Sequence, residues 1–460
     1  MEPDDEIYAN GEADSSNSRN RPIISSEQLD IEAYAGLYTG RTKITRLLFI
    51  ADQCGQNNNT AMQMEALRMA YEEIKKGENT QLFRDVVHKI DGRLGDDYGM
   101  DSAWCEMVDR RADQRKEKLE NELNAYRTNL IKESIRMGYN DFGDYYYAHG
   151  SLAEAFKSYV RTRDYCTTSK HVIHMCMSAI LVSIEMGQFT HVTSYINKAE
   201  QTADALDPNT VSKLRCAAGL ANLDAKKYKL AARKFLEVGP ELGNSYNEVI
   251  APQDVATYGG LCALASFDRM ELKNKVIDSI NFRNFLELVP EVRELIHDFY
   301  SSHYASCLDY LGNLKANLML DIHLHDHVQT LYDQIRNKAL IQYTHPFLHE
   351  LTHTTKFYMH GMQIKGMPLS SGYCRQARHA RCVRTLCIAN FFIIRCKLLR
   401  LLDLTVDCPV FLNLNYTQVS FLFSSNFPST FVCEVRHFHL FVRLFEAVQL
   451  QLLGLVRTVS

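Results

Sequence analysis

The densest cluster of side chains able to bind a metal is the run His323-Leu324-His325-Asp326-His327. A His-x-His pair followed by a carboxylate occurs in metal-dependent hydrolases, where such groups hold Zn²⁺. Here Asp333 stands where the hydrolase motif has a serine, and alternate residues of a helix point in different directions. We interpret the run as a solvated loop or the start of a helix. A metal-dependent hydrolase that uses His323, His325 and Asp326 is the alternative.

A second group of potential ligands lies near the end of the chain and comprises Cys374, His379, Cys382, Cys387 and Cys396. Successive cysteines here are 8, 5 and 9 positions apart, which does not give the two closely spaced C-x₂₋₄-C pairs of a zinc finger. The arginines of the same segment recur every three residues, as Arg375, Arg378, Arg381 and Arg384. One side of a helix could present them to RNA, but no aromatic residues alternate with them, so we expect no nucleic-acid partner.

Motifs for nucleotide or acyl chemistry are missing from the sequence. There is no phosphate-binding loop and no G-x-S-x-G nucleophile elbow. Gly259-Gly260 lacks the third glycine and the preceding strand of a dinucleotide site, and a close approach of two helices explains it better. We therefore predict no catalytic residue, no metal and no cofactor.

The charge of the chain changes abruptly along its 460 residues. Residues 348–460 hold 12 Lys plus Arg against 5 Asp plus Glu, whereas the part before them holds 39 against 50. The formal net charge of −4 therefore combines a net −11 with a net +7. The last segment also carries 6 of the 13 Cys and 11 of the 22 Phe. A single domain rarely changes composition in this way, so the two parts are considered separately.

The N-terminus and the scattered cysteines indicate an intracellular protein. Residues 1–28 begin with an acidic, polar stretch that has no apolar core of a signal peptide, and we expect them to be disordered. Seven unpaired, irregularly spaced cysteines before Phe347 are typical of reduced, buried thiols. No segment is apolar enough for a convincing membrane span, so we expect no membrane partner.

Three windows share a pattern typical of stacked helix pairs. Aligning Ala155, Val192 and Ala231 gives steps of 37 and 39 residues, close to the tetratricopeptide period. In such repeats a small residue marks the helix crossing, a glycine marks the turn, and Ala with an aromatic residue packs on the second helix. The predicted repeat-packing residues are Gly143, Tyr146, Gly150, Ala155, Tyr159, Gly219, Ala231 and Phe235.

Apolar stripes at helical spacing flank these repeats. Upstream, the stripe is Leu119, Leu123, Tyr126 and Leu130, on a long helix with a charged outer face. Downstream, the stripes are Val292, Leu295, Ile296 and Phe299, then Tyr304, Leu308, Leu311 and Leu318, with Pro290 at a helix start. Nothing from Leu29 to Phe347 alternates as a strand would, so we predict an all-α fold.

Several longer segments carry a family resemblance. They are Tyr34-Ala35-Gly36-Leu37-Tyr38, Arg46-Leu47-Leu48-Phe49-Ile50-Ala51, Ile131-Lys132-Glu133-Ser134-Ile135-Arg136, Lys213-Leu214-Arg215-Cys216, Tyr258-Gly259-Gly260-Leu261-Cys262 and Arg336-Asn337-Lys338-Ala339-Leu340. From about Leu29 to Tyr343 the chain resembles the COP9 signalosome subunit 1 family, most closely its plant members.

The resemblance implies a tetratricopeptide-like helical arm followed by a PCI domain, which is a helical bundle capped by a winged helix. It implies a non-catalytic scaffold in a hetero-oligomer of signalosome subunits, a complex that removes NEDD8 from cullins of cullin-RING ligases. In plants this complex represses photomorphogenesis through the phytochrome pathway. The nucleus and the cytoplasm are the implied locations. A proteasome-lid or translation-initiation PCI subunit remains the alternative interaction protein.

The chain departs from the family after Tyr343, where no winged-helix pattern follows. The Phe-, Cys- and Arg-rich tail resembles translated non-coding sequence, such as a retained intron or a frameshift. We therefore expect residues 1–28 to be a disordered N-terminus, 29–240 a helical-repeat arm, 241–347 a truncated PCI bundle and 348–460 a tail foreign to the family.

Overall fold

The structure is a computed structural model of the chain, and it describes residues 29–202 and 206–342. These residues all belong to the first of two compact units into which the chain divides, residues 1–388. The predictions for residues 1–28 and 348–460, including the loss of the winged helix, lie outside the described residues. The proposed boundary at residue 240 stays a prediction.

Every regular element of the described residues is helical, which confirms the all-α prediction for them. The first helices are α1 (Ile31–Ala35), α2 (Gly40–Gln56), α3 (Thr60–Ile74), α4 (Thr80–Ile90) and α5 (Ser102–Thr128). The next are α6 (Lys132–Ala148), α7 (Leu152–Arg161), α8 (Ser169–Glu185), α9 (Phe189–Thr202), α10 (Pro208–Asp224) and α11 (Tyr228–Leu236). The last are α12 (Pro252–Ser266), α13 (Arg269–Leu272), α14 (Ile280–Leu286), α15 (Pro290–Tyr300), α16 (Tyr304–Leu318) and a helix at residues 325–342. Short 3-10 turns lie at Asp96–Tyr98, Thr162–Tyr165 and Pro240–Leu242, and a π turn at Lys273–Ile277.

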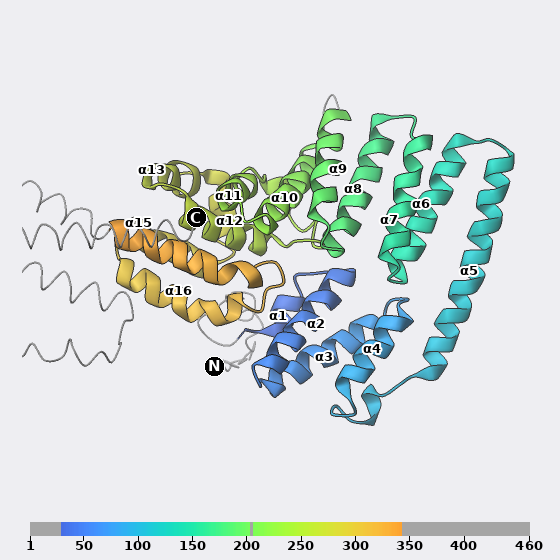
Figure 1. The fold of residues 1–460 in the computed structure, drawn as a ribbon, viewed down its shortest axis with the longest axis horizontal. Coiled ribbons are helices and arrows are strands. Elements are labelled where there is room, and N and C mark those ends of the chain that lie inside the picture. The colour runs from blue at the N-terminus through green and yellow to red at the C-terminus, as the bar shows by residue number, and fades with distance from the viewer. Residues whose placement is uncertain (1–28, 203–205, 343–460) are drawn as a thin grey trace, which may run out of the picture. The chain divides into compact units, whose positions relative to one another are not determined.

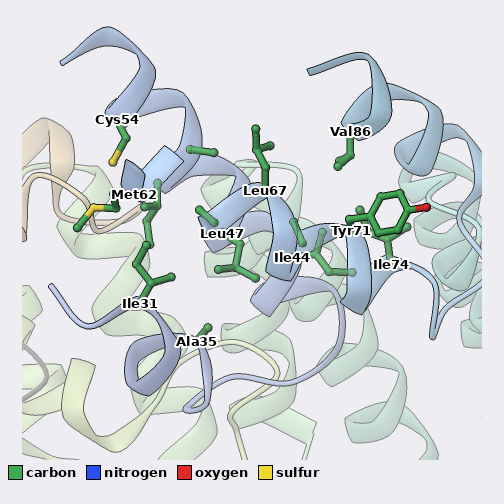
Figure 2. Close-up of a cluster of buried hydrophobic side chains, with 14 of the residues drawn as sticks. Ile31, Ala35, Ile44, Leu47, Cys54, Met62, Leu67, Tyr71, Ile74 and Val86 are labelled. Atoms are coloured by element: carbon green, nitrogen blue, oxygen red, sulfur yellow. The ribbon is translucent and has the colours of Figure 1, made fainter. Parts of the chain in front are cut away.

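Helices α1 to α4 share one apolar core, part of which is drawn in Figure 2. Leu47, Leu67 and Phe83 are fully buried there. The same core includes Ala251 and Leu320 from far along the chain. Asn59 and Asn79 accept a backbone N–H three residues ahead, which fixes the starts of α3 and α4. The N-terminal helices are therefore anchored on residues that follow the repeats.

The helices from α6 to α11 pack sequentially, each on the next (Figure 1). Ala155, Val192 and Ala231 lie on α7, α9 and α11, and all three are fully buried. A helix pair buries only part of its apolar surface, so neighbouring pairs share a core. This arrangement confirms the helical-repeat prediction.

The predicted stripe at the end of α5 is wrong at its last residue. Leu119 and Leu123 are buried, but α5 ends at Thr128 and Leu130 is 80% exposed. Leu130 has a positive φ of 55° because it belongs to the tight turn into α6. The helical spacing continues in the sequence although the helix has already ended.

The burial of the downstream apolar stripes and of the cysteines agrees with the prediction from the sequence. Residues Val292 to Phe299 of the first stripe and Leu308 to Leu318 of the second are buried, and Pro290 is the first residue of α15. The seven cysteines of the described residues are free thiols, and only Cys166 is partly exposed. Within residues 29–202 and 206–342, no helix combines the length and the apolar character needed to cross a membrane.

Candidate functional site

The three histidines of the His323–His327 run face different neighbours. The Nδ1 atom of His325 lies 2.7 Å from the carbonyl oxygen of Met319, and its ring meets Phe49 edge-on. The Nδ1 atom of His327 lies 3.3 Å from the hydroxyl of Tyr228. The described residues contain no cluster of His, Cys, Asp and Glu able to hold a metal ion. The geometry therefore does not support the hydrolase alternative.

The run lies in a turn that leads into a helix at residue 325, which confirms the predicted helix start, but only Asp326 of the run is exposed. His327 is buried, and burial lowers its pKa because the imidazolium form is poorly hydrated there. Burial, with Arg46 nearby, lowers the pKa of His323 to about 4. Both rings are therefore neutral at physiological pH, His327 in the interior and His323 partly buried.

Four of the eight predicted repeat-packing residues meet in two pairs, each across a helix crossing. A Cβ atom at Gly143 of α6 would overlap the ring of Tyr159 of α7, and one at Gly219 of α10 would overlap the ring of Phe235 of α11. Only a residue without a side chain fits at either crossing. Of the other four, Ala155 and Ala231 are fully buried and Tyr146 is partly buried. Gly150 lies in the turn after α6 and has a positive φ.

The turns between paired helices use the left-handed conformation at equivalent positions. Gly150 and Gly187 have φ values of 84° and 68°, and Lys226 takes the same place in the third pair with φ of 57°. In each turn the residue itself donates to the carbonyl three residues back, and the next residue donates to the carbonyl five back. This is the Schellman hydrogen-bond pattern at a helix end. The sequence comparison of the windows missed Lys226 because it is not a glycine.

The most highly connected polar group in the described residues was not predicted at all. We call it the Arg46 cluster, and it consists of Tyr34, Tyr38, Arg46, Asp254, Tyr258 and Asp321. Tyr34 comes from α1, Arg46 from α2, and Asp254 and Tyr258 from α12. Tyr38 lies between α1 and α2, and Asp321 follows α16. The cluster thus joins three segments that are more than 60 residues apart in sequence.

Arg46 is the centre of this cluster and is only 2% exposed. Its Nη1 atom donates to Asp321 Oδ2 at 2.8 Å, and its Nη2 atom donates to Asp254 Oδ2 at 3.1 Å. The guanidinium also stacks on the ring of Tyr38, with its carbon 4.0 Å from the ring centroid. A buried guanidinium needs such partners because transfer out of water is otherwise very unfavourable.

Tyrosine hydroxyls complete the hydrogen bonding of the two carboxylates. Tyr38 donates to Asp254 at 2.8 Å, and Tyr258 donates to Asp321 at 2.7 Å. Tyr34 accepts a hydrogen bond from Arg46 at 2.7 Å and donates one to Asp321 at 3.1 Å. Burial raises the pKa of all three phenols, so they remain neutral donors.

The two carboxylates differ in their protonation equilibria. Burial raises the pKa of Asp254 to about 6, although Arg46 acts in the opposite direction. Burial also acts to raise the pKa of Asp321, but Arg46, His323 and the hydrogen bonds from Tyr258 and the Leu324 N–H outweigh it, and the net pKa is lowered. The cluster therefore holds one cation between two carboxylates, of which Asp254 is the weaker acid.

This arrangement ties α1 and α2 to α12 and to the residues after α16. Both acids are hydrogen-bonded to neighbours, and Asp254 also accepts the N–H of Ala251 at the start of α12. One signal in the sequence could have found the cluster: Asp254 is the only charged residue in α12, a helix with thirteen buried residues. A lone carboxylate on such a helix requires a buried partner.

Comparison with known proteins finds similarity to subunits of two large complexes. The family model described as 26S proteasome subunit RPN7 matches residues 101–275. The chain is 77% identical over 343 residues to COP9 signalosome complex subunit 1 of Arabidopsis thaliana, covering 75% of this chain and 77% of that protein. It is 37% identical over 399 residues to COP9 signalosome complex subunit 1b of Drosophila melanogaster, covering 75% of each. It is 22% identical over 226 residues to 26S proteasome non-ATPase regulatory subunit 6 of Dictyostelium discoideum, covering 49% of this chain and 59% of that protein.

Proposed function

The chain belongs to the COP9 signalosome subunit 1 family, and on this premise we propose that it acts as a non-catalytic scaffold subunit of the COP9 signalosome. The observation that supports this most directly is the 77% identity to the Arabidopsis thaliana protein over 343 residues. The fold is consistent with a scaffold, because successive helix pairs present long surfaces to partners.

In finer detail, we propose that the chain takes part in the removal of NEDD8 from the cullins of cullin-RING ligases. Its direct partners would be the other signalosome subunits, and its contact with the ligases would be indirect. We also propose a role in the repression of photomorphogenesis, with the protein in the nucleus and the cytoplasm, as the resemblance to the plant family members implies. The buried side chains of the Arg46 cluster hold the helices that such contacts would use.

A proteasome-lid subunit is the second candidate, because the RPN7 family model matches residues 101–275. The identity to the proteasomal relative is 22%, however, against 77% to the signalosome relative. We therefore favour the signalosome over the proteasome lid and over a translation-initiation complex.

The test is to express the tagged full chain in plant cells and to analyse the purified assembly by native mass spectrometry. We expect signalosome subunits to co-purify and proteasome-lid subunits to be absent. Recovery of lid or initiation-factor subunits in their place would refute the proposal. The ratio of NEDD8-conjugated to free cullin, after depletion of the resident subunit and expression of this chain, tests the finer statement.

We further propose that residues 348–460 are translated non-coding sequence that replaces the winged helix. The charge change at residue 348 supports this. A chain altered in this way should assemble at less than full stoichiometry. Full stoichiometry in the native complex, or an exon that encodes the tail in frame, would refute it. Sequencing the transcript across the codons around Tyr343 is the most direct measurement.

A further inference from the structure

A groove with a basic rim lies between the α3–α4 turn and the first half of α5, and it encloses about 290 Å³. Lys75 and Lys76 line it from the end of α3, and Arg111 and Arg115 line it from α5. No part of the Arg46 cluster lines it, so it is independent of the contacts described above.

The groove carries an excess of positive charge. Its lining contains four cations and one carboxylate, that of Glu78. Lys75 pairs with Asp101 at 2.8 Å, Lys76 with Glu73 at 2.9 Å and Arg115 with Glu78 at 3.7 Å. Arg111 is exposed and forms no ion pair within the described residues. Residues 1–347 have a net charge of −11, so the positive charge of the groove is opposite in sign to the net charge of the part of the chain that contains it.

Apolar side chains also line the groove, and we call these four its apolar floor: Trp104, Met107, Val108 and Ala112. It contains Trp104, the only tryptophan of the chain, whose ring packs 4.8 Å from that of Phe83. Met107 beside it is 48% exposed. A rigid indole next to a flexible thioether is a combination that accepts an apolar side chain of a partner.

We propose that this basic groove binds an acidic peptide segment of a partner protein, with one apolar residue of that segment against Trp104 and Met107. Charge complementarity selects the acid, since Arg111 at the exposed rim would face a carboxylate and Lys76 could bind a second one beside Glu73. The apolar floor favours a peptide over a polyphosphate, which has no apolar group to cover it. The proposal does not depend on assembly into a complex.

The experiment measures the anisotropy of a fluorescein-labelled peptide, Glu-Asp-Glu-Asp-Phe-Glu-Asp-Glu, on titration with the full chain. We expect saturable binding that weakens as salt is added. Arg111→Glu should weaken it at least about tenfold, which corresponds to about 1.4 kcal/mol. Arg110→Glu is the matched control, because Arg110 is an exposed arginine on the same helix outside the groove, and it should change the affinity less than about twofold.

Three results would overturn the proposal. Equal losses in Arg111→Glu and Arg110→Glu would mean that the peptide senses only general charge. Unchanged affinity when glycine replaces the phenylalanine of the peptide would mean that the apolar floor is not used. Binding that appears only after deletion of residues 1–28 would mean that the groove is occupied by the chain's own acidic N-terminus. Circular dichroism of both variants verifies that each remains folded.

Discussion

Replacement of Arg46 by methionine should destabilise the protein strongly, because it leaves two carboxylates in the interior without their cation. Arg46 lies 3.1 Å from Asp254 and 2.8 Å from Asp321, and all three side chains are at most 5% exposed. Removing one partner from a buried ion pair lowers the free energy of unfolding by about 3–5 kcal/mol. Arg46→Met should fall in this range at pH 8.

Arg68→Met is the matched control. Arg68 also contacts two carboxylates, Glu65 at 2.6 Å and Glu72 at 2.7 Å, but its side chain is 36% exposed on the surface of α3. Exposed pairs contribute about 0–1 kcal/mol, so this variant should remain close to wild type. Urea unfolding monitored by Trp104 fluorescence suits both variants, since Trp104 packs against the N-terminal core. Equal losses in the two variants would refute the reasoning.

The pH dependence gives an independent check. Burial raises the pKa of Asp254 from an ordinary value of 3.8 to about 6. The folded state therefore holds this proton more tightly than the unfolded state, and the resulting stabilisation is complete below 3.8 and lost as the pH rises through about 6. Without Arg46 the pKa should rise further, so the gap between wild type and Arg46→Met should widen from pH 5 to pH 8. A gap that is constant or narrows over this range contradicts the assignment. Adding Asp254→Asn to Arg46→Met should recover part of the loss at pH 8.

Three further outcomes follow from the repeats and the tail. Gly219→Ala should lower the free energy of unfolding by about 1–3 kcal/mol in a urea titration, because its Cβ would overlap the Phe235 ring. Lys226→Gly should raise the melting temperature slightly, since a left-handed φ of 57° is unfavourable for lysine, whereas Gly187→Lys should lower it. A chain ending at residue 342 should be more soluble in a sedimentation assay than the full chain, because Val419 to Phe423 form an apolar segment of high β-propensity.

The sequence predicts the local part of this fold well. Ala155, Val192 and Ala231 are identified by their spacing because each contacts a helix close by in the chain, and Gly143 because its crossing partner Tyr159 is only 16 residues away. The error at Leu130 also arises because the prediction uses only local spacing. An apolar stripe records which residues can pack on a helix, and it does not record where the helix stops, which depends on the turn that follows.

The long-range part escapes such reasoning. Arg46 precedes Asp254 by 208 residues and Asp321 by 275, and no periodic pattern connects them. The histidine run shows the same limit, because the burial of His327 depends on Tyr228, which is 99 residues away. Polar residues in an apolar context, such as Asp254 in α12, are the signal that remains, and they indicate that a partner exists without indicating which one.

The position of the Arg46 cluster bears on how the chain is divided. A cut at residue 240 separates Tyr34, Tyr38 and Arg46 from both acids that neutralise the guanidinium. It also removes Ala251 and Leu320 from the apolar core of α1 to α4. Apolar contact alone would allow these helices to shift on α12, since it has little directional preference, whereas the hydrogen bonds to Asp254 and Asp321 fix a single register. The boundary at residue 240 therefore separates two sequence patterns but crosses one core, and the first helices depend for their stability on residues that follow the repeats.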